Sequence, residues 1–126
     1  MSHWSSKYLQ MDFSNTTCSA FCEYVLNDHF GKEYKFPQSQ GSVFNQSAQL
    51  KKHIPEYCIE TKEPKDGDLV LMNGLRRLCH VGLFVKIGVV DYVLHCEIKM
   101  GRSALHRIKD LSSYGYTLSG FYTWLR

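Results

Sequence analysis

The sequence contains no apolar run long enough to cross a membrane. Its longest apolar stretches, 81–85 and 87–90, are separated by Lys86 and closed by Asp91, whereas a membrane-spanning helix needs roughly 20 apolar residues. The opening segment, MSHWSSKYLQMDF, also lacks the apolar core of a secretory signal. We therefore expect a protein that is synthesised in the cytoplasm without a signal peptide.

The paired spacings of common zinc sites are absent too, because neither a CxxC nor an HxxxH motif occurs. An odd number of cysteines without a secretory signal favours reduced thiols over a disulfide framework. We expect neither a metal nor an organic cofactor. The cysteines are Cys18, Cys22, Cys58, Cys79 and Cys96.

The chain length predicts one domain spanning residues 1–126. An apolar content of 44% and a charged content of 21% are ordinary for a globular protein and exclude a disordered, collagen-like or coiled-coil chain. The net charge of +3 arises entirely in residues 97–126. This excess allows a weak attraction to an anionic partner or is simply a solvated face. No nucleic-acid-binding motif is present.

The order of predicted elements places helices first and strands second. Residues 16–30 predict a helix, because Phe21, Val25 and Leu26 recur at helical spacing and Gly31 follows as a stop. Residues 42–53 form a weaker helix pattern. This order is typical of the α+β class with a largely antiparallel sheet. The predicted strands are 68–72, 79–85, 90–98, 103–108 and 118–125.

A hairpin between Cys79 and Cys96 brings two histidines together. We centre it between Ile87 and Gly88 with a four-residue loop, because isoleucine disfavours positive φ. His80 then lies opposite His95 on one face of the sheet, and both cysteines lie on the other. The two imidazoles form a site or are exposed cross-strand neighbours. The remaining predicted pairs are Val81 with Leu94, Leu83 with Tyr92, Val85 with Val90, Phe84 with Asp91 and Gly82 with Val93.

Cys18 falls in the first turn of the predicted helix at 16–30, where free N–H groups and the helix dipole favour a thiolate. A cysteine nucleophile also needs a base and a third group that orients this base. Cys18, His80 and His95 can supply these three parts. The alternative for Cys18 is a small buried apolar residue.

Four segments together resemble the NlpC-type cysteine peptidases, a papain-like family of cell-wall hydrolases. That family carries a D-C-S-G-F-like motif at the start of a helix, a G-D-L-V strand, an H-V-G-I strand and a further strand ending in a third polar residue, often His. The order and spacing match from about Trp4 to Trp124. The segments here are TCSAF (17–21), PKDGDLVLM (64–72), CHVGLFV (79–85) and YVLHCE (92–97).

This resemblance implies a papain-like α+β fold in which Cys18 is the nucleophile, His80 the general base and acid, and His95 the orienting residue. Two neighbours of Cys18 depart from the family pattern. Thr17 stands where an acidic residue is usual, and Ala20 stands where glycine is usual.

Ser19, Phe13 and Gly82 are the candidate oxyanion or substrate residues. Phe13 matches a position where many members carry an aromatic hydroxyl, and Tyr8 is a less direct substitute. We therefore expect the backbone N–H groups of Cys18 and its neighbours to hold the oxyanion. Gly67 and Asp68 are interpreted as a structural turn. The surface histidines are predicted to be His106, His53, His29 and His3.

The resemblance implies cleavage of an amide bond in peptidoglycan stem peptide, of the γ-D-glutamyl–diamino acid type, through a thioester. The HW..KYL start and the LSGFYTW ending resemble short phage-encoded members associated with tail tips. This subgroup implies phage tail proteins as partners and action at the cell wall when a virion or an exported assembly carries the protein. The alternatives are a non-catalytic tail adaptor and an amidase or acyl hydrolase of the same fold with another substrate.

Overall fold

The computed structural model describes residues 3–9, 18–32, 52–74, 79–97 and 102–125. The predicted helix at 42–53 falls almost wholly outside these ranges, and residues 52–57 are helical. In the described residues, helical segments at 18–30 and 52–57 precede the sheet, as expected for the α+β class. The elements are η1 (Trp4–Tyr8), α1 (Cys18–Phe30), β1 (Cys58–Thr61), β2 (Leu69–Asn73), β3 (Cys79–Ile87), β4 (Val90–Glu97), β5 (Arg102–Arg107), η3 (Ile108–Tyr114) and β6 (Thr117–Trp124).

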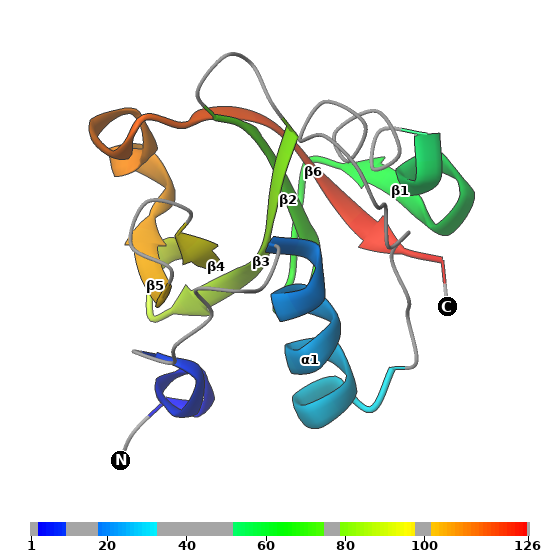
Figure 1. Ribbon diagram of the computed structural model, residues 1–126, viewed down its shortest axis with the longest axis horizontal. Helices are drawn as coiled ribbons and strands as arrows, with labels where there is room; N and C mark the ends of the chain where they lie inside the picture. Colours follow the sequence, from blue (N-terminus) through cyan, green and yellow to red (C-terminus); the bar gives the residue numbers. More distant parts are fainter. Residues whose placement is uncertain (1–2, 10–17, 33–51, 75–78, 98–101, 126) are drawn as a thin grey trace.

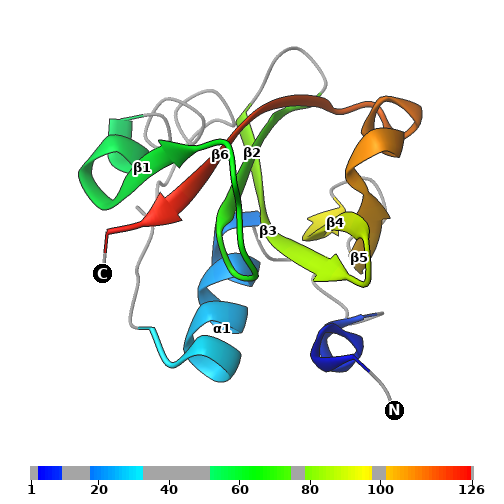
Figure 2. The same ribbon diagram turned by 180° about the vertical axis from the view of Figure 1, so that it is seen from behind.

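The strands of the described residues form a six-stranded sheet in the order β1-β6-β2-β3-β4-β5, and every neighbouring pair is antiparallel. All five predicted strands are present within two residues of their predicted ends. Figure 1 shows α1 beneath the central strands, with β1 and β6 on one side and β4 and β5 on the other. The reverse view in Figure 2 shows the same arrangement.

Helix α1 ends where the sequence predicts. Gly31 adopts a left-handed φ of 64°, and the N–H of Lys32 donates to the carbonyl of Leu26 at 3.0 Å. A glycine in this conformation is a common end of a helix, because it adopts a positive φ without steric cost and turns the chain back onto the last helical turn. The predicted capping residues at 15–17 lie outside the described residues. The inner face of α1 buries Phe21, Cys22, Val25 and Leu26.

The central strands of the sheet are buried on both faces. One face packs against α1 and buries the alternate positions Leu69, Leu71, Val81, Leu83, Val85 and Leu94. The opposite face buries a second cluster, covered by the η3 region: Val70, Met72, Phe84, Val93, Leu111 and Tyr116. Burial on both sides explains why β2 is almost continuously apolar. In a strand with one exposed face, apolar and polar residues would alternate.

The β3–β4 hairpin differs from its predicted register by two residues. Ile87 pairs with Val90 and Lys86 with Asp91, so the loop contains only Gly88 and Val89. Gly88 supplies the positive φ of 64° that a two-residue hairpin loop needs. Ile87 therefore stays in the strand, and the premise of the longer loop was wrong. The observed pairs that replace the predicted ones are Leu83 with Leu94, Phe84 with Val93 and Val85 with Tyr92.

A shift of two residues leaves every side chain on its predicted face, because side chains along a strand alternate with a period of two. His80 and His95 therefore share one face but are diagonal neighbours instead of directly opposed residues. Cys96 packs on the other face, in the cluster with α1. The prediction of a shared histidine face is confirmed, and the prediction of directly opposed histidines is wrong.

Gly67 and Asp68 join β2 to the strands around it. Gly67 adopts a φ of 89°, and its carbonyl accepts a hydrogen bond from the indole N–H of Trp124 at 2.7 Å. The buried Asp68 carboxylate accepts from the Lys65 backbone N–H at 2.9 Å and from the Thr123 hydroxyl at 2.9 Å. These contacts fit the structural turn that the sequence predicts.

Candidate active site

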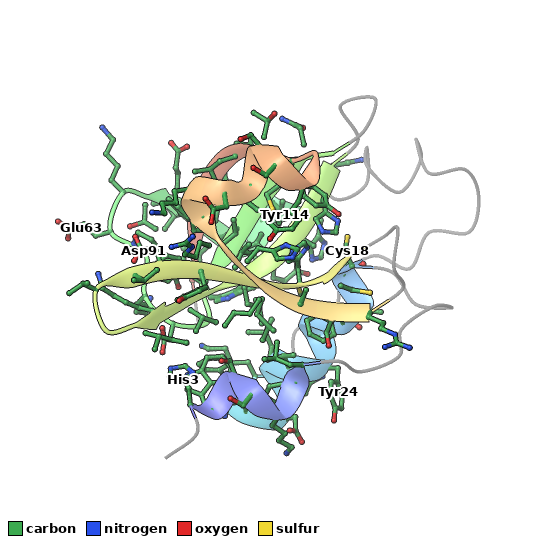
Figure 3. The ribbon with its side chains drawn as sticks, turned by 90° about the vertical axis from the view of Figure 1, so that its left-hand side faces the viewer. His3, Cys18, Tyr24, Glu63, Asp91 and Tyr114 are labelled. Atoms are coloured by element: carbon green, nitrogen blue, oxygen red, sulfur yellow. The ribbon has the colours of Figure 1, made fainter. Side chains whose placement is uncertain are left out.

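Cys18 is the first residue of α1, and its side chain is partly buried. Figure 3 shows it at the end of α1 that lies next to the strands. Burial raises the pKa of the Cys18 thiol, while hydrogen bonding from the backbone N–H groups of Val81, Ser19 and Cys18 itself acts in the opposite direction. The predicted fall in thiol pKa is therefore wrong for this structure, because desolvation outweighs the donors at the helix start.

The backbone of β3 shows why Val81 has an N–H available for the thiol. The N–H of Phe84 donates to Asp68, and the carbonyl of Phe84 accepts from Gly67, so the polar backbone groups of Phe84 point toward the β2 side. Successive residues of a strand point these groups to alternate sides. Those of Val81 therefore point toward β4, and the β3–β4 pairing ends at Leu83 and Leu94.

His80 and His95 are both completely buried, with 0% of their surface exposed. The Nε2 atom of His80 lies 2.8 Å from Nδ1 of His95, which places a hydrogen bond between the two rings. Burial lowers the pKa of His80 to about 4. Burial also lowers the pKa of His95 well below its usual value, and the neighbouring His80 and His106 add to this effect. Both rings are therefore neutral near pH 7.

The second ring nitrogen of His80, Nδ1, is buried without a hydrogen-bond partner in the described part of the chain. The Cys18 thiol therefore makes no hydrogen bond to this nitrogen in the structure. A buried nitrogen without a partner is uncommon in folded proteins and marks a candidate catalytic position. The Tyr116 ring stacks on the His80 ring at 4.7 Å between centroids and holds its plane.

Gly82 makes room for the second histidine. A Cβ atom built at Gly82 would lie 2.5 Å from Cγ2 of Val93 and 2.9 Å from Cβ of His95. Both distances are shorter than nonbonded carbon atoms allow. Glycine at this position therefore lets β4 approach β3 closely enough for His95 to reach His80, which is a packing role.

The sequence that carries this helix-start cysteine and these two strand histidines matches a known family. The model of the NlpC/P60 family matches residues 4–110. The chain belongs to the NlpC/P60 family. No curated protein and no solved structure matches the chain. The NlpC/P60 family is generally one of hydrolases, namely cysteine peptidases and amidases of the cell-wall type.

His106 is a site residue that the sequence analysis missed in this NlpC/P60 domain. It was predicted to be a surface residue, yet its ring is partly buried and its Nδ1 lies 3.0 Å from Nε2 of His95. The β4–β5 register places His106 opposite Val93, one step along the face from His95. Only this register, which the sequence did not define, could have revealed the contact.

The other candidate residues differ in how close they lie to the thiol and the histidine cluster. Ser19 is buried in the first turn of α1. The Tyr8 hydroxyl donates to Asp28 at 2.6 Å, near the far end of α1 from Cys18, so it does not replace the missing aromatic hydroxyl at the thiol. Phe13 and Thr17 lie outside the described residues. The remaining histidines are partly or fully exposed and lie away from this cluster: His3, His29 and His53.

Within the described ranges, no group of three or more histidine, cysteine or acidic side chains is arranged to hold a metal ion. The described residues also include no helix that is both long and apolar enough to span a membrane. Four cysteines whose side chains are described are free thiols: Cys18, Cys22, Cys58 and Cys96.

Gly82→Ala should destabilise the protein by about 1–3 kcal/mol, the usual cost of overpacking. The added methyl group must push His95 or Val93 away. Denaturant unfolding measures the loss. Gly120→Ala is the matched control on β6, because its Cβ would meet only side-chain ends at or near ordinary contact, the Glu60 carboxylate at 3.3 Å and the Tyr122 ring at 3.4 Å. Equal stability of Gly82→Ala and the wild type would contradict the close approach of β4.

Stability should fall as the pH decreases from about 6.5 toward 4 and should change little between about pH 6.5 and 8, below the range in which the thiols of the unfolded chain ionise. The unfolded chain binds protons at His80 in this range, whereas the folded chain, with a His80 pKa of about 4, does not. The loss from His80 alone is on the order of 2 kcal/mol at pH 5, and His95 acts in the same direction. Urea midpoints at pH 7 and pH 5 measure it.

His80→Gln should flatten this pH dependence, because it removes one buried site that binds protons only after unfolding. His29→Gln is the control, since it changes an exposed histidine on α1. A wild-type urea midpoint that is the same at pH 5 and pH 7 would mean that the two rings are not buried as described.

Proposed function

We propose that this protein is a cysteine hydrolase that cleaves an amide bond in peptidoglycan stem peptide, of the γ-D-glutamyl–diamino acid type, through a thioester intermediate. The observation that carries the proposal is the state of His80. One of its ring nitrogens is bound to His95 at 2.8 Å, and the other is buried and unpartnered, one residue from the Val81 N–H that borders the Cys18 thiol.

These contacts support one atom for each proposed role. The Nε2 atom of His80 is engaged by His95, so Nδ1 is the nitrogen that exchanges a proton with Cys18. His95 holds the His80 ring and is the orienting residue. This division follows the general requirement for a nucleophile, a base and a group that fixes the tautomer of the base.

The raised thiol pKa and the lowered imidazole pKa favour a neutral pair before substrate binds. The Cys18 proton therefore moves to Nδ1 of His80 as the sulfur attacks the substrate carbonyl carbon. The tetrahedral intermediate collapses when Nδ1 returns the proton to the amide nitrogen, the C–N bond breaks and the amine leaves. Water then loses a proton to His80, attacks the thioester and releases the acid and the thiol.

The backbone N–H groups that border the thiol are the proposed oxyanion donors. Hydrogen bonding from Cys18, Ser19 and Val81 already favours negative charge on the sulfur. Such fixed donors stabilise the charge that develops on an adjacent carbonyl oxygen. Phe13 and Gly82 remain proposed substrate-side residues, although Gly82 already has the packing role beside His95.

The substrate and the place of action rest on family membership. We propose that the enzyme is made in the cytoplasm and acts at the cell wall when a virion or an exported assembly carries it, with phage tail proteins as partners. A same-fold hydrolase acting on another amide and a non-catalytic adaptor are the outcomes that the following experiments separate from this proposal.

Cys18 should react with iodoacetamide before the other described cysteines near neutral pH. Its side chain is partly exposed, whereas the thiols of Cys22, Cys58 and Cys96 are buried. Burial also raises the pKa of Cys58 to about 12 and that of Cys22 well above its usual value. Peptide mapping after partial alkylation identifies the first site. Initial labelling of Cys22 would contradict the assignment of the nucleophile.

Turnover of purified muropeptides should nearly vanish in Cys18→Ala and His80→Ala, because general acid–base catalysis contributes about 10²–10⁴-fold. His95→Asn should retain more activity than His95→Ala, since asparagine can still accept a hydrogen bond from His80. His80→Asn should rescue nothing, because asparagine cannot transfer the proton. Mass spectrometry of the digestion products measures turnover and identifies the bond that is cut.

His29→Ala is the matched control for loss of a histidine outside the site, and the circular dichroism of each variant checks that it is folded. Full activity of His80→Ala would remove His80 as the base. A wild-type protein that alkylates rapidly at Cys18 but leaves muropeptides intact would favour a hydrolase with another substrate. A slow Cys18 together with intact muropeptides would favour the adaptor.

A further inference from the structure

Three imidazoles form a continuous chain across three neighbouring strands. Nε2 of His80 on β3 meets Nδ1 of His95 on β4 at 2.8 Å, and Nε2 of His95 meets Nδ1 of His106 on β5 at 3.0 Å. Both nitrogens of His95 are therefore engaged by other histidines. The proposed reaction assigns roles to only two of the three rings.

The His106 ring is held firmly where it meets His95. Tyr114 stacks on it with centroids 3.7 Å apart and planes only 6° from parallel. Figure 3 labels Tyr114 on η3, the element that covers this face of the sheet. His106 is thus a fixed partner of His95 in a short, well-defined contact.

The state of His95 is coupled to that of His80, because a neutral imidazole carries a proton on only one nitrogen. When His95 carries its proton on Nε2, it donates to His106 and accepts at Nδ1 from His80. His80 then has its lone pair on Nδ1, where it can take the Cys18 proton. When His95 carries its proton on Nδ1, it donates to His80, and Nδ1 of His80 is already protonated.

We propose that His106 is a positioning residue that keeps the proton of His95 on Nε2 and thereby leaves Nδ1 of His80 free to act as the base. This inference rests on the proposed function of Cys18 and His80. A buried N–H without an acceptor is rarer in proteins than a buried acceptor without a donor. With His106 as acceptor at Nε2 of His95, only the tautomer with a protonated His80 Nδ1 leaves a buried N–H without an acceptor. Without His106, either tautomer leaves one such N–H, at Nε2 of His95 or at Nδ1 of His80. The preference is therefore lost, and part of the His80 population holds the tautomer that cannot accept the thiol proton.

The test replaces His106 in two ways. His106→Leu removes the acceptor while keeping an apolar side chain against Tyr114, whereas His106→Asn keeps an acceptor at the δ position. His53→Leu is the matched control, because His53 stacks on Tyr57 at 4.2 Å as His106 stacks on Tyr114, but lies outside the chain of histidines. Each protein is labelled with ¹⁵N-histidine, and two-bond ¹H–¹⁵N spectra report which nitrogen of His95 carries the proton.

We expect the His95 proton on Nε2 in the wild type, in His106→Asn and in His53→Leu, and divided between Nδ1 and Nε2 in His106→Leu. Turnover and the rate of Cys18 alkylation should fall about twofold in His106→Leu and should recover most of this loss in His106→Asn, since the rate follows the fraction of His80 whose Nδ1 can accept the thiol proton. A merely structural role for His106 would change stability without moving the His95 proton.

The tautomer measurement separates this inference from the proposed function. A folded His106→Leu with the His95 proton still on Nε2 would overturn the role of His106, even in an active enzyme. A wild-type proton on Nδ1 would overturn it as well. A wild type that neither hydrolyses muropeptides nor alkylates first at Cys18 would instead overturn the proposed function, while the spectra would still decide how His106 acts on His95.

Discussion

The hydrogen bond between His80 and His95 is the constraint on which the rest of the site depends. Two imidazoles with no exposed surface must find partners for their nitrogens inside the protein, because an unsatisfied buried polar group costs about 1–3 kcal/mol. The bond requires β3 and β4 to approach closely, and the missing side chain of Gly82 makes this approach possible. Burial then keeps both rings neutral, which is the state that a proton acceptor needs.

The two-sided sheet explains how a helix and a pair of histidines on opposite faces can form one site. Helix α1 packs on the face that carries Val81 and Leu83, whereas His80 and His95 project from the other face. Cys18 meets the sheet where the β3–β4 pairing ends and where the Val81 N–H is directed toward β4. At the end of this pairing, two adjacent residues of β3 therefore contribute to the candidate site. Val81 contributes the N–H that acts on the thiol, and His80 contributes its ring.

The element types and faces could be predicted from the sequence, because they depend on local periodicity. The register could not, since Gly88 accepts a positive φ and keeps Ile87 in the strand, which moves every pair by two positions. An even shift preserves faces, so the shared histidine face was predictable but the diagonal contact was not. His106 was missed because its position depends on pairing between β4 and β5. The raised pKa of Cys18 depends on burial by distant residues, which the helix-start pattern does not contain.

Burial raises the pKa of Cys18 and lowers the pKa of His80, the two partners of the proposed proton transfer. These two shifts limit the mechanism. Desolvation disfavours the thiolate of Cys18 and the imidazolium of His80 alike, so a preformed ion pair is the costly state. The proton must then move as sulfur bonds to carbon, when the charge passes to an oxygen beside backbone donors. Such a step needs His80 to present its lone pair at Nδ1 from the outset, because a wrong tautomer cannot be corrected during the attack. A fixed tautomer is therefore more important here than a lowered thiol pKa, and the chain from His80 through His95 to His106 is built from the contacts that can fix it.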